Sequence, residues 1–256
     1  MTRPEFLYKY RQDTDRQIDA LMSCKAIFSG RKGLNDPYDA KFNLVQPSIL
    51  ELERVDLASR VCQDRTAVPL PRFIKNGKIT SSGNVFLQTF YKVCDELIES
   101  YRFYCLSANP TSGLMWAHYS GDHTGFCISF RSEHAPGNKV IYEDRPLEIR
   151  LSENLVDAQS HALGQDIWRG LRTKQTIWEY EEEYRLQASN EAQRQFVKVA
   201  PHSDAAEYDP DWVDSIIFGL RMPLARRRTI MQSYKHPVKF KEVVMSGMGF
   251  TIVDLS

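Results

Sequence analysis

Hydrophobic and polar residues follow two different periods along this chain, and the periods predict its strands and helices. Apolar or aromatic residues at alternate positions predict strands, and apolar residues three or four positions apart predict amphipathic helices. The predicted strands are residues 6–11, 25–30, 102–107, 125–130, 139–143, 183–188, 196–200 and 214–219, with a C-terminal hairpin at 237–255. The predicted helices are residues 13–24, 48–62, 85–101, 114–120, 153–172 and 223–234.

The order of these elements indicates the fold class. Strands and helices are interleaved without the regular β–α–β units of a parallel sheet, so we expect an α+β protein. Its core is expected to be a mixed, mostly antiparallel central β-sheet with flanking helices. Proline and glycine cluster at residues 64–84 and predict an exposed loop there. No linker forces a boundary, so residues 1–256 are predicted to form a single domain.

Composition narrows the classes of function. The chain has 256 residues, of which 42% are hydrophobic and 26% charged, as expected of a folded protein rather than a disordered one. Lysine plus arginine equals aspartate plus glutamate at 33 each, which argues against nucleic-acid binding driven by bulk charge. A local basic patch stays open: residues 226–228, all arginine, form either a solvated helix face or a contact for RNA or phosphate.

The cysteines indicate a reducing compartment. They are five in number, contain no Cys-x-x-Cys pair and mostly stand in apolar surroundings: Cys24, Cys62, Cys94, Cys105 and Cys127. This pattern is typical of reduced core residues in a cytoplasmic protein. The N-terminal residues contain no apolar run typical of a signal peptide, and no stretch approaches the length of a membrane span, so no membrane partner is expected.

The stretch MWAHYSGDHTGFCISF, residues 115–130, gathers aromatic residues and a histidine just before a predicted strand. Aromatic side chains serve either core packing or the wall of a ligand pocket. Met115 is expected in the core. Trp116 fits either reading, and His118 and Tyr119 are expected on the border between core and pocket.

A second polar run is WEYEEEYRLQ, residues 178–187. If a strand runs through it, Glu181, Glu183 and Arg185 project to one face, where two carboxylates and a guanidinium must be paired or in water. The alternative is an exposed helix end with charge pairs four residues apart.

The N-terminal strand LYKYR, residues 7–11, places Lys9 and Arg11 on one face and Tyr8 and Tyr10 on the other. Cations beside aromatic rings can hold a phosphate or ribose and stack a flat ring. The alternative is an edge strand whose lysine prevents aggregation.

Weaker signals have structural alternatives. Residues 30–33, GRKG, have the spacing of a phosphate-clamping loop or form a simple turn, and residues 35–39, NDPYD, contain turn-capping aspartates. His118, His123 and Cys127 could ligate a metal, but they lack the close pairs of zinc sites, so no metal is predicted. Walker, GxGxxG, GxSxG and HExxH motifs do not occur.

Several of these sequence segments occur in an order that resembles the bacterial domain-of-unknown-function family 2971. The resemblance is carried by residues 7–11, 28–39, 105–130, 178–186 and 216–219, and so extends over most of the chain. Its most specific parts are LMWAHY…GFCI and the run Trp-x-Tyr-Glu-x-Glu-aromatic-Arg. The family name records no activity.

A further resemblance, at the level of fold, is to ADP-ribosyltransferases, whose sheet is split. Such folds begin with a strand carrying histidine or arginine, continue with an aromatic or serine strand, and later present a catalytic glutamate. By this resemblance Lys9 or Arg11 takes the first place, although lysine is unusual there. Phe28 and Ser29 take the second place, and Glu183 takes the third.

The resemblance implies a site that cleaves the nicotinamide bond of NAD, which is then a substrate. A carboxylate would stabilise the positive charge that develops on the ribose, aromatic walls would hold nicotinamide, and cations would hold the pyrophosphate. The implied catalytic residues are Glu183 and, as the fallback, Glu181. The implied NAD-binding residues are Lys9, Tyr10, Arg11, Phe28, Ser29, Trp116, His118, Tyr119 and Arg185.

We therefore expect an NAD-dependent ADP-ribosyltransferase or NAD glycohydrolase, acting as a bacterial toxin, effector or antiphage defence component. The macromolecular acceptor, protein or nucleic acid, is not indicated by the sequence. The alternatives are a non-catalytic module that senses a nucleotide or nucleic acid, and a metal-dependent nuclease that uses Glu181, Glu183 and aspartates.

Overall fold

The computed structural model describes residues 3–61, 72–150, 161–187, 198–199 and 205–255. It divides the chain into two compact units, each built from separate stretches of sequence. Unit 1 contains residues 1–33, 101–142 and 176–256, and unit 2 contains residues 34–100 and 143–175. The prediction of one domain over residues 1–256 stays a prediction.

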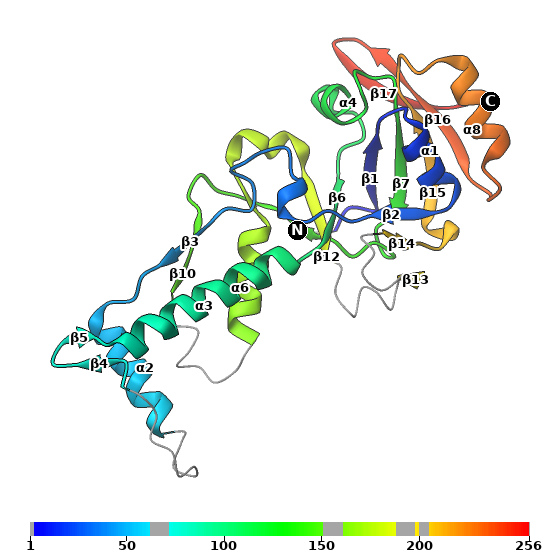
Figure 1. The fold of residues 1–256 in the computed structure, drawn as a ribbon. Helices are drawn as coiled ribbons and strands as arrows, with labels where there is room; N and C mark the ends of the chain where they lie inside the picture. Colours follow the sequence, from blue (N-terminus) through cyan, green and yellow to red (C-terminus); the bar gives the residue numbers. More distant parts are fainter. Residues whose placement is uncertain (1–2, 62–71, 151–160, 188–197, 200–204, 256) are drawn as a thin grey trace. The chain divides into compact units, whose positions relative to one another are not determined.

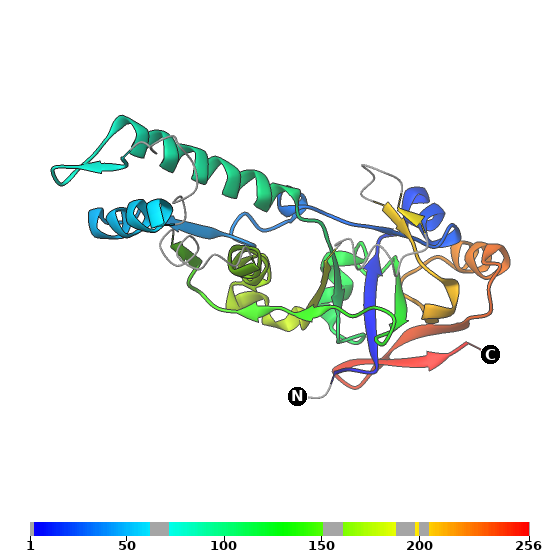
Figure 2. The same ribbon diagram turned by 90° about the horizontal axis from the view of Figure 1, so that it is seen from below.

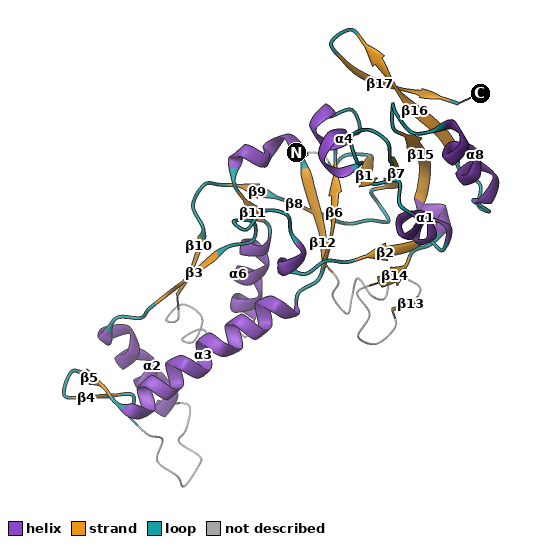
Figure 3. Cartoon of the chain, turned by 45° about the horizontal axis from the view of Figure 1, so that its top comes forward, coloured by secondary structure: helices purple, strands orange, loops and turns teal. Residues whose placement is uncertain are grey.

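Unit 1 is built on an eight-stranded sheet with the order β17-β16-β15-β7-β1-β6-β12-β8 (Figures 1 and 3). Neighbouring strands are antiparallel except β15 and β16, which are parallel. The strands are β1 (Phe6–Arg11), β6 (Phe103–Ser107), β7 (Phe126–Arg131), β8 (Asn138–Lys139), β12 (Glu183–Gln187), β15 (Val213–Phe218), β16 (Lys239–Ser246) and β17 (Gly249–Asp254).

One face of this sheet packs on the main hydrophobic core. Alternate residues of the strands, including Leu7, Ile128 and Ile216, join that core with Ile18 of helix α1 (Asp15–Met22) and Ile230 of helix α8 (Leu224–Ser233). The side chain of Thr14 caps α1 by accepting a hydrogen bond from the Gln17 backbone. Because side chains alternate along each strand, the remaining side chains of these strands point to the opposite face of the sheet.

The opposite face is covered by helix α4 (Gly113–Tyr119), which carries Met115 and Trp116. These side chains pack with Tyr10, Cys127 and Val243 in a second, smaller core. The remaining elements of unit 1 are β2 (Lys25–Ile27), η1 (Arg31–Gly33), β9 (Ile141–Tyr142), η2 (Thr176–Glu181), β13 (Lys198–Val199), β14 (Ala205–Glu207) and η3 (Pro210–Trp212). Strands β13, β14 and β2 form an antiparallel three-stranded sheet.

Unit 2 contains two long helices that lie side by side, α2 (Ile49–Val61) and α3 (Ser81–Ser100) (Figure 2). Its strands are the parallel pair β3 (Phe42–Val45) and β10 (Leu147–Arg150), the hairpin β4 (Ile74–Lys75) and β5 (Lys78–Ile79), and β11 (Thr173–Lys174). Helix α6 (His161–Leu171) packs closely on β3. The approach is so close that a Cβ added at Gly170 would come within 2.1 Å of the Phe42 ring.

The α+β class and the mostly antiparallel central sheet are confirmed. Most predicted elements of unit 1 occur within one or two residues of their expected bounds, and the predicted strand at 139–143 is interrupted at Val140. In the part of the chain that the model describes, no helix has both the length and the apolar character needed to cross a membrane. The cysteines of that part are free, while Cys62 lies outside it.

The predicted loop at 64–84 needs correction where it is described. Residues 62–71 lie outside the described residues, but residues 74–79 form the β4–β5 hairpin and α3 begins at Ser81. Asn76 and Gly77 have positive φ values of 52° and 66°, the conformation that an Asn-Gly pair favours in a two-residue hairpin turn. Strands β3 and β10 were not predicted, and residues 153–160 of the helix predicted at 153–172 lie outside the described part.

Candidate functional site

A row of polar residues crosses the α4-covered face of the central sheet. The strand registers pair Glu183 with Ser107, Ser107 with Tyr8, Tyr8 with Ser129, and Ser129 with Ser215. The three serines and Glu183 are buried, whereas Tyr8 is half-buried. Burial raises the pKa of Tyr8, and a hydrogen bond with Ser129 opposes that rise. Buried polar side chains are uncommon in an apolar layer, so this row is the feature of the face that points to a functional site.

Glu183 forms a buried ion pair with Arg185 on the same strand. Arg185 Nε lies 2.8 Å from Glu183 Oε1, and Arg185 Nη2 lies 3.1 Å from Oε2, so the contact is bidentate. The Arg185 guanidinium carbon also lies 4.9 Å from the centroid of the Phe103 ring. A buried carboxylate stays ionised only with a compensating charge, which Arg185 provides.

Glu181 is also buried and lies at the end of η2, two residues before Glu183. The Tyr119 hydroxyl donates a hydrogen bond to Glu181 Oε1 over 2.5 Å. Ser107 Oγ donates to the Glu181 carbonyl oxygen over 2.6 Å. Both glutamates therefore adjoin Ser107. Glu183 pairs with it in the strand register, and the main-chain carbonyl of Glu181 accepts a hydrogen bond from it.

Glu182, between the two buried glutamates, has a φ of +44°, which is unfavourable for a residue with a Cβ. The segment after β6 holds this conformation: the Ala108 backbone donates to the Glu182 carbonyl over 3.0 Å, and Asn109 Nδ2 donates to Glu182 Oε1 over 2.9 Å. This left-handed residue ends η2 and starts β12, and so fixes how Glu181 and Glu183 are presented. Strained backbone of this kind is concentrated at functional sites.

Helix α4 supplies one wall of this region. The Ser112 side chain caps its first turn, and Trp116 is fully buried, with Nε1 donating to the Pro110 carbonyl over 2.8 Å. The Tyr10 ring contacts the Trp116 ring edge-on, with centroids 5.0 Å apart. The Tyr10 hydroxyl donates to the Asn109 carbonyl over 2.6 Å. Trp116 and Tyr10 therefore serve packing in the second core.

His118 and Tyr119, at the end of α4, both reach η2. His118 is exposed, and its Nδ1 lies 3.0 Å from the Tyr180 hydroxyl. Tyr119 makes the hydrogen bond to Glu181 described above. The structure thus brings the two α4 residues and the two glutamates to the same face of the sheet. A single cavity shared by His118, Tyr119 and Glu183 stays a prediction.

The predicted cations of β1 lie on the opposite face of the sheet. Lys9 pairs with Ile128, which belongs to the main core, and its Nζ donates to the Cys105 carbonyl over 2.7 Å. Burial, with Arg11 nearby, lowers the pKa of Lys9 from 10.5 to about 8. Arg11 Nη2 lies 3.4 Å from the Tyr104 hydroxyl. Strand alternation therefore separates these cations from the Glu183 side chain.

Phe28 and Ser29 also lie away from the glutamates. The Phe28 ring is buried in the main core, with its centroid 5.7 Å from that of Tyr104. The Ser29 backbone exchanges two hydrogen bonds of 2.9 Å with Phe103. Of the predicted site, the structure assembles Trp116, His118, Tyr119, Glu181, Glu183, Arg185 and Tyr10 on one face. It places Lys9, Arg11 and Phe28 on the other.

The weaker sequence motifs have structural roles. Arg226 contacts Asp13 and Asp15 at 2.8 and 2.9 Å, and Arg227 forms an ion pair with Glu242 and donates to main-chain carbonyls. Residues 30–33 form a tight turn closed by a Gly33-to-Gly30 hydrogen bond of 2.9 Å. Within the described residues, no group of three or more histidine, cysteine, aspartate or glutamate side chains is arranged to hold a metal ion.

Sequence reasoning missed Ser107 and the segment around Asn109 as parts of this site. Asn109 Oδ1 accepts from the Thr111 backbone over 2.9 Å and its amide donates to Glu182, so one side chain joins two loops. Serines in a strand give no individual signal. Their row becomes visible only when the strand register is known.

The fold and site define an α+β protein with a mostly antiparallel sheet and a buried carboxylate face of unassigned chemistry. Residues 115–186 match the family model described as "Protein of unknown function (DUF2971)", which confirms the resemblance to domain-of-unknown-function family 2971 over that segment. The match contains Trp116, His118, Tyr119, Glu181 and Glu183. Neither the curated proteins nor the solved structures contain a match to this chain.

Proposed function

We propose that this protein cleaves the nicotinamide bond of NAD, as an ADP-ribosyltransferase or NAD glycohydrolase, on the α4-covered face of the central sheet. The observation that supports the proposal is the pair of buried glutamates, Glu181 and Glu183, beside the polar row of Ser107 and Tyr8. Departure of nicotinamide leaves positive charge on the ribose, and a fixed, ionised carboxylate stabilises such charge.

Each side chain has a role in this proposal. Glu183, kept ionised by Arg185, is the stabilising carboxylate, and Glu181, oriented by the Tyr119 hydroxyl, is the second. His118 and Tyr180, joined by their 3.0 Å contact, form the outer aromatic wall for nicotinamide. Lys9 and Arg11 have no part in it, because they lie on the other face. The ADP-ribosyl group is captured by water or by a nucleophile of a macromolecular acceptor, which loses a proton as the new bond forms.

The first test incubates the purified protein with NAD and measures nicotinamide by chromatography. Turnover is expected, and Glu183→Gln should reduce it at least about 100-fold, the loss typical of removing one electrostatic group. Because this variant removes the negative charge that compensates the buried Arg185, activity is compared well below each protein's melting temperature. Glu181→Gln is the second variant. Glu179→Gln, on the exposed side of η2, is the matched control.

A second candidate follows from the closed geometry of the Glu183–Arg185 pair. Because the two side chains already satisfy each other, the same face also suits a module that binds a nucleotide without turnover. A thermal shift with NAD and no nicotinamide release would favour this sensor over the enzyme. Activity that requires a divalent metal ion and is lost with a chelator would favour the nuclease alternative.

The biological setting belongs to the same proposal. An enzyme of this kind would act in the cytoplasm as a toxin, effector or antiphage defence component, where NAD is abundant. Expression of the wild-type chain in a bacterial host should then lower cellular NAD and slow growth. The Glu183→Gln chain, expressed to the same level, should do neither.

A further inference from the structure

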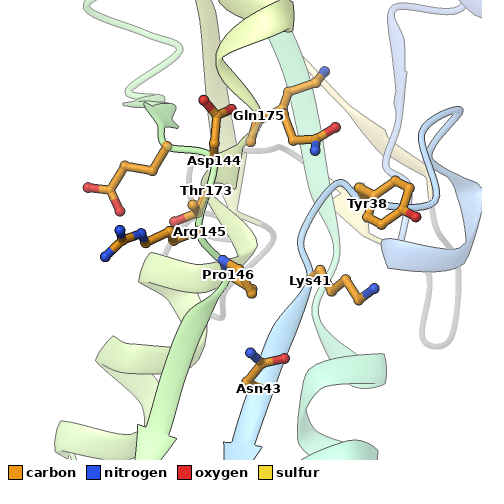
Figure 4. A pocket seen from close by; sticks show the side chains of 10 residues that line it. Tyr38, Lys41, Asn43, Asp144, Arg145, Pro146, Thr173 and Gln175 are labelled. Atoms are coloured by element: carbon orange, nitrogen blue, oxygen red, sulfur yellow. The ribbon is translucent and has the colours of Figure 1, made fainter.

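Unit 2 contains a pocket that is separate from the carboxylate face. It has a volume of about 240 Å³, and the segments that precede β3 and β10 stand on either side of it (Figure 4). Tyr38 and Lys41 line it from the first segment and Asn43 from the start of β3, while Asp144 and Arg145 line it from the second. Thr173 and Gln175 line it from the β11 segment.

Buried contacts hold this pocket in shape. Lys174, which lines it, forms an ion pair of 3.4 Å with Asp39, and the two side chains are only 3% and 0% exposed. The Glu143 backbone donates to the Lys174 carbonyl over 2.9 Å, which ties one wall to β11. The Ala40 backbone donates to the Thr173 carbonyl over 3.4 Å, which ties the other wall to β11 as well. The walls are therefore fixed before any ligand binds.

The groups around the pocket combine an aromatic ring and a cation on one wall with the carboxylates of Glu143 and Asp144 on the other. Tyr38 is 55% exposed, and Lys41 Nζ lies 4.6 Å from the centroid of its ring. Arg145 also lines the pocket, but its side chain extends away from Tyr38 and Lys41 (Figure 4). An exposed ring beside a cation suits a ligand that has a flat aromatic part and an anionic part.

We propose that this pocket binds a ribonucleoside monophosphate. The base would stack on Tyr38, Lys41 would contact the phosphate, and Asn43 and Gln175 would provide amide groups for polar edges. Asp144 would accept from a ribose hydroxyl, as carboxylates do in many nucleotide sites. A free α-amino acid would also find both charges here, but it would leave the exposed Tyr38 ring unused.

Isothermal titration calorimetry with AMP tests the proposal, and AMP contains no nicotinamide bond for the proposed enzyme to cleave. Saturable binding is expected, with Tyr38→Ala and Lys41→Ala each weakening it about tenfold, the size of one lost stacking or charged contact. Tyr38→Phe keeps the ring and should bind as wild type. Lys78→Ala removes an exposed lysine of the β5 hairpin and is the matched control.

Four results would overturn it: no saturable AMP binding, equal affinity for AMP and inorganic phosphate, preference for an α-amino acid such as glutamate, or undiminished AMP binding by Tyr38→Ala. The test is independent of the proposed function. Glu183→Gln should bind AMP normally, and Tyr38→Ala should still release nicotinamide. Failure of one site therefore leaves the other proposal standing.

Discussion

The Glu183 carboxylate and the Arg185 guanidinium, two residues apart on β12, form a bidentate ion pair with side chains 5% and 0% exposed. The period of a strand places both on the same face, and both side chains are buried there. Burying either charge alone is costly, so the pair determines how this region tolerates change.

Arg185→Met should lower the free energy of unfolding by about 3–5 kcal/mol, because it removes the positive charge that compensates a buried carboxylate. Adding Glu183→Gln should restore part of that loss, since the charge disappears. Urea unfolding of the single and double variants measures the coupling. Strictly additive losses would show that the two side chains do not depend on each other.

Tyr119→Phe should destabilise the protein by about 1.5–3 kcal/mol, because it removes the hydroxyl that donates to the buried Glu181 carboxylate. The same change at exposed Tyr38 is expected to stay within about 0.5 kcal/mol. Chemical denaturation of both variants makes the comparison. Similar small effects at the two positions would mean that Glu181 does not rely on Tyr119.

Residue 182 should prefer glycine to alanine. Both substitutions remove the side-chain contact with Asn109, but only glycine adopts the observed φ of +44° without strain. We expect Glu182→Gly to be more stable than Glu182→Ala by about 1 kcal/mol. Thermal unfolding of the two variants decides it, and a more stable alanine variant would contradict the left-handed conformation.

Trp116→Ala should cost about 3–5 kcal/mol of stability, as expected for a fully buried aromatic residue that fills a core. Leu114→Ala, on the same helix but 50% exposed, should have little effect. His118→Ala should reduce activity or ligand affinity more than stability, because its ring is exposed. The reverse order of effects for Trp116 and His118 would return His118 to a structural role.

The pH dependence of stability should report the burial of Lys9. Its pKa is about 8 in the folded protein and 10.5 ordinarily, so between these values the unfolded chain binds more protons and stability rises with pH. The tyrosines and cysteines with raised pKa act in the opposite direction, so the difference between wild type and Lys9→Met isolates the lysine. That difference should move in favour of wild type from pH 8 to 10.5, as measured by urea unfolding. A constant difference would argue against the lowered pKa.

Much of the fold follows from local sequence signals. Strand β1 was predicted at its observed bounds, and α4 differs by one residue at each end. The β4–β5 hairpin was missed although Asn76-Gly77 is a typical turn pair, because surrounding prolines and glycines indicated a loop. The parallel strands β3 and β10 were missed because each is short and its partner is distant in sequence.

The sequence by itself determined which residues share a strand or a helix: Glu183 with Arg185, Lys9 with Arg11, and Trp116 with His118 and Tyr119. Local periodicity suffices for that, because side chains alternate along a strand and recur every turn of a helix. Only the tertiary structure decided that Lys9 and Glu183 point to opposite faces, that Tyr119 reaches Glu181, and that Tyr38 and Arg145 line one pocket. These relations depend on strand register and on contacts between distant segments, which no local pattern encodes.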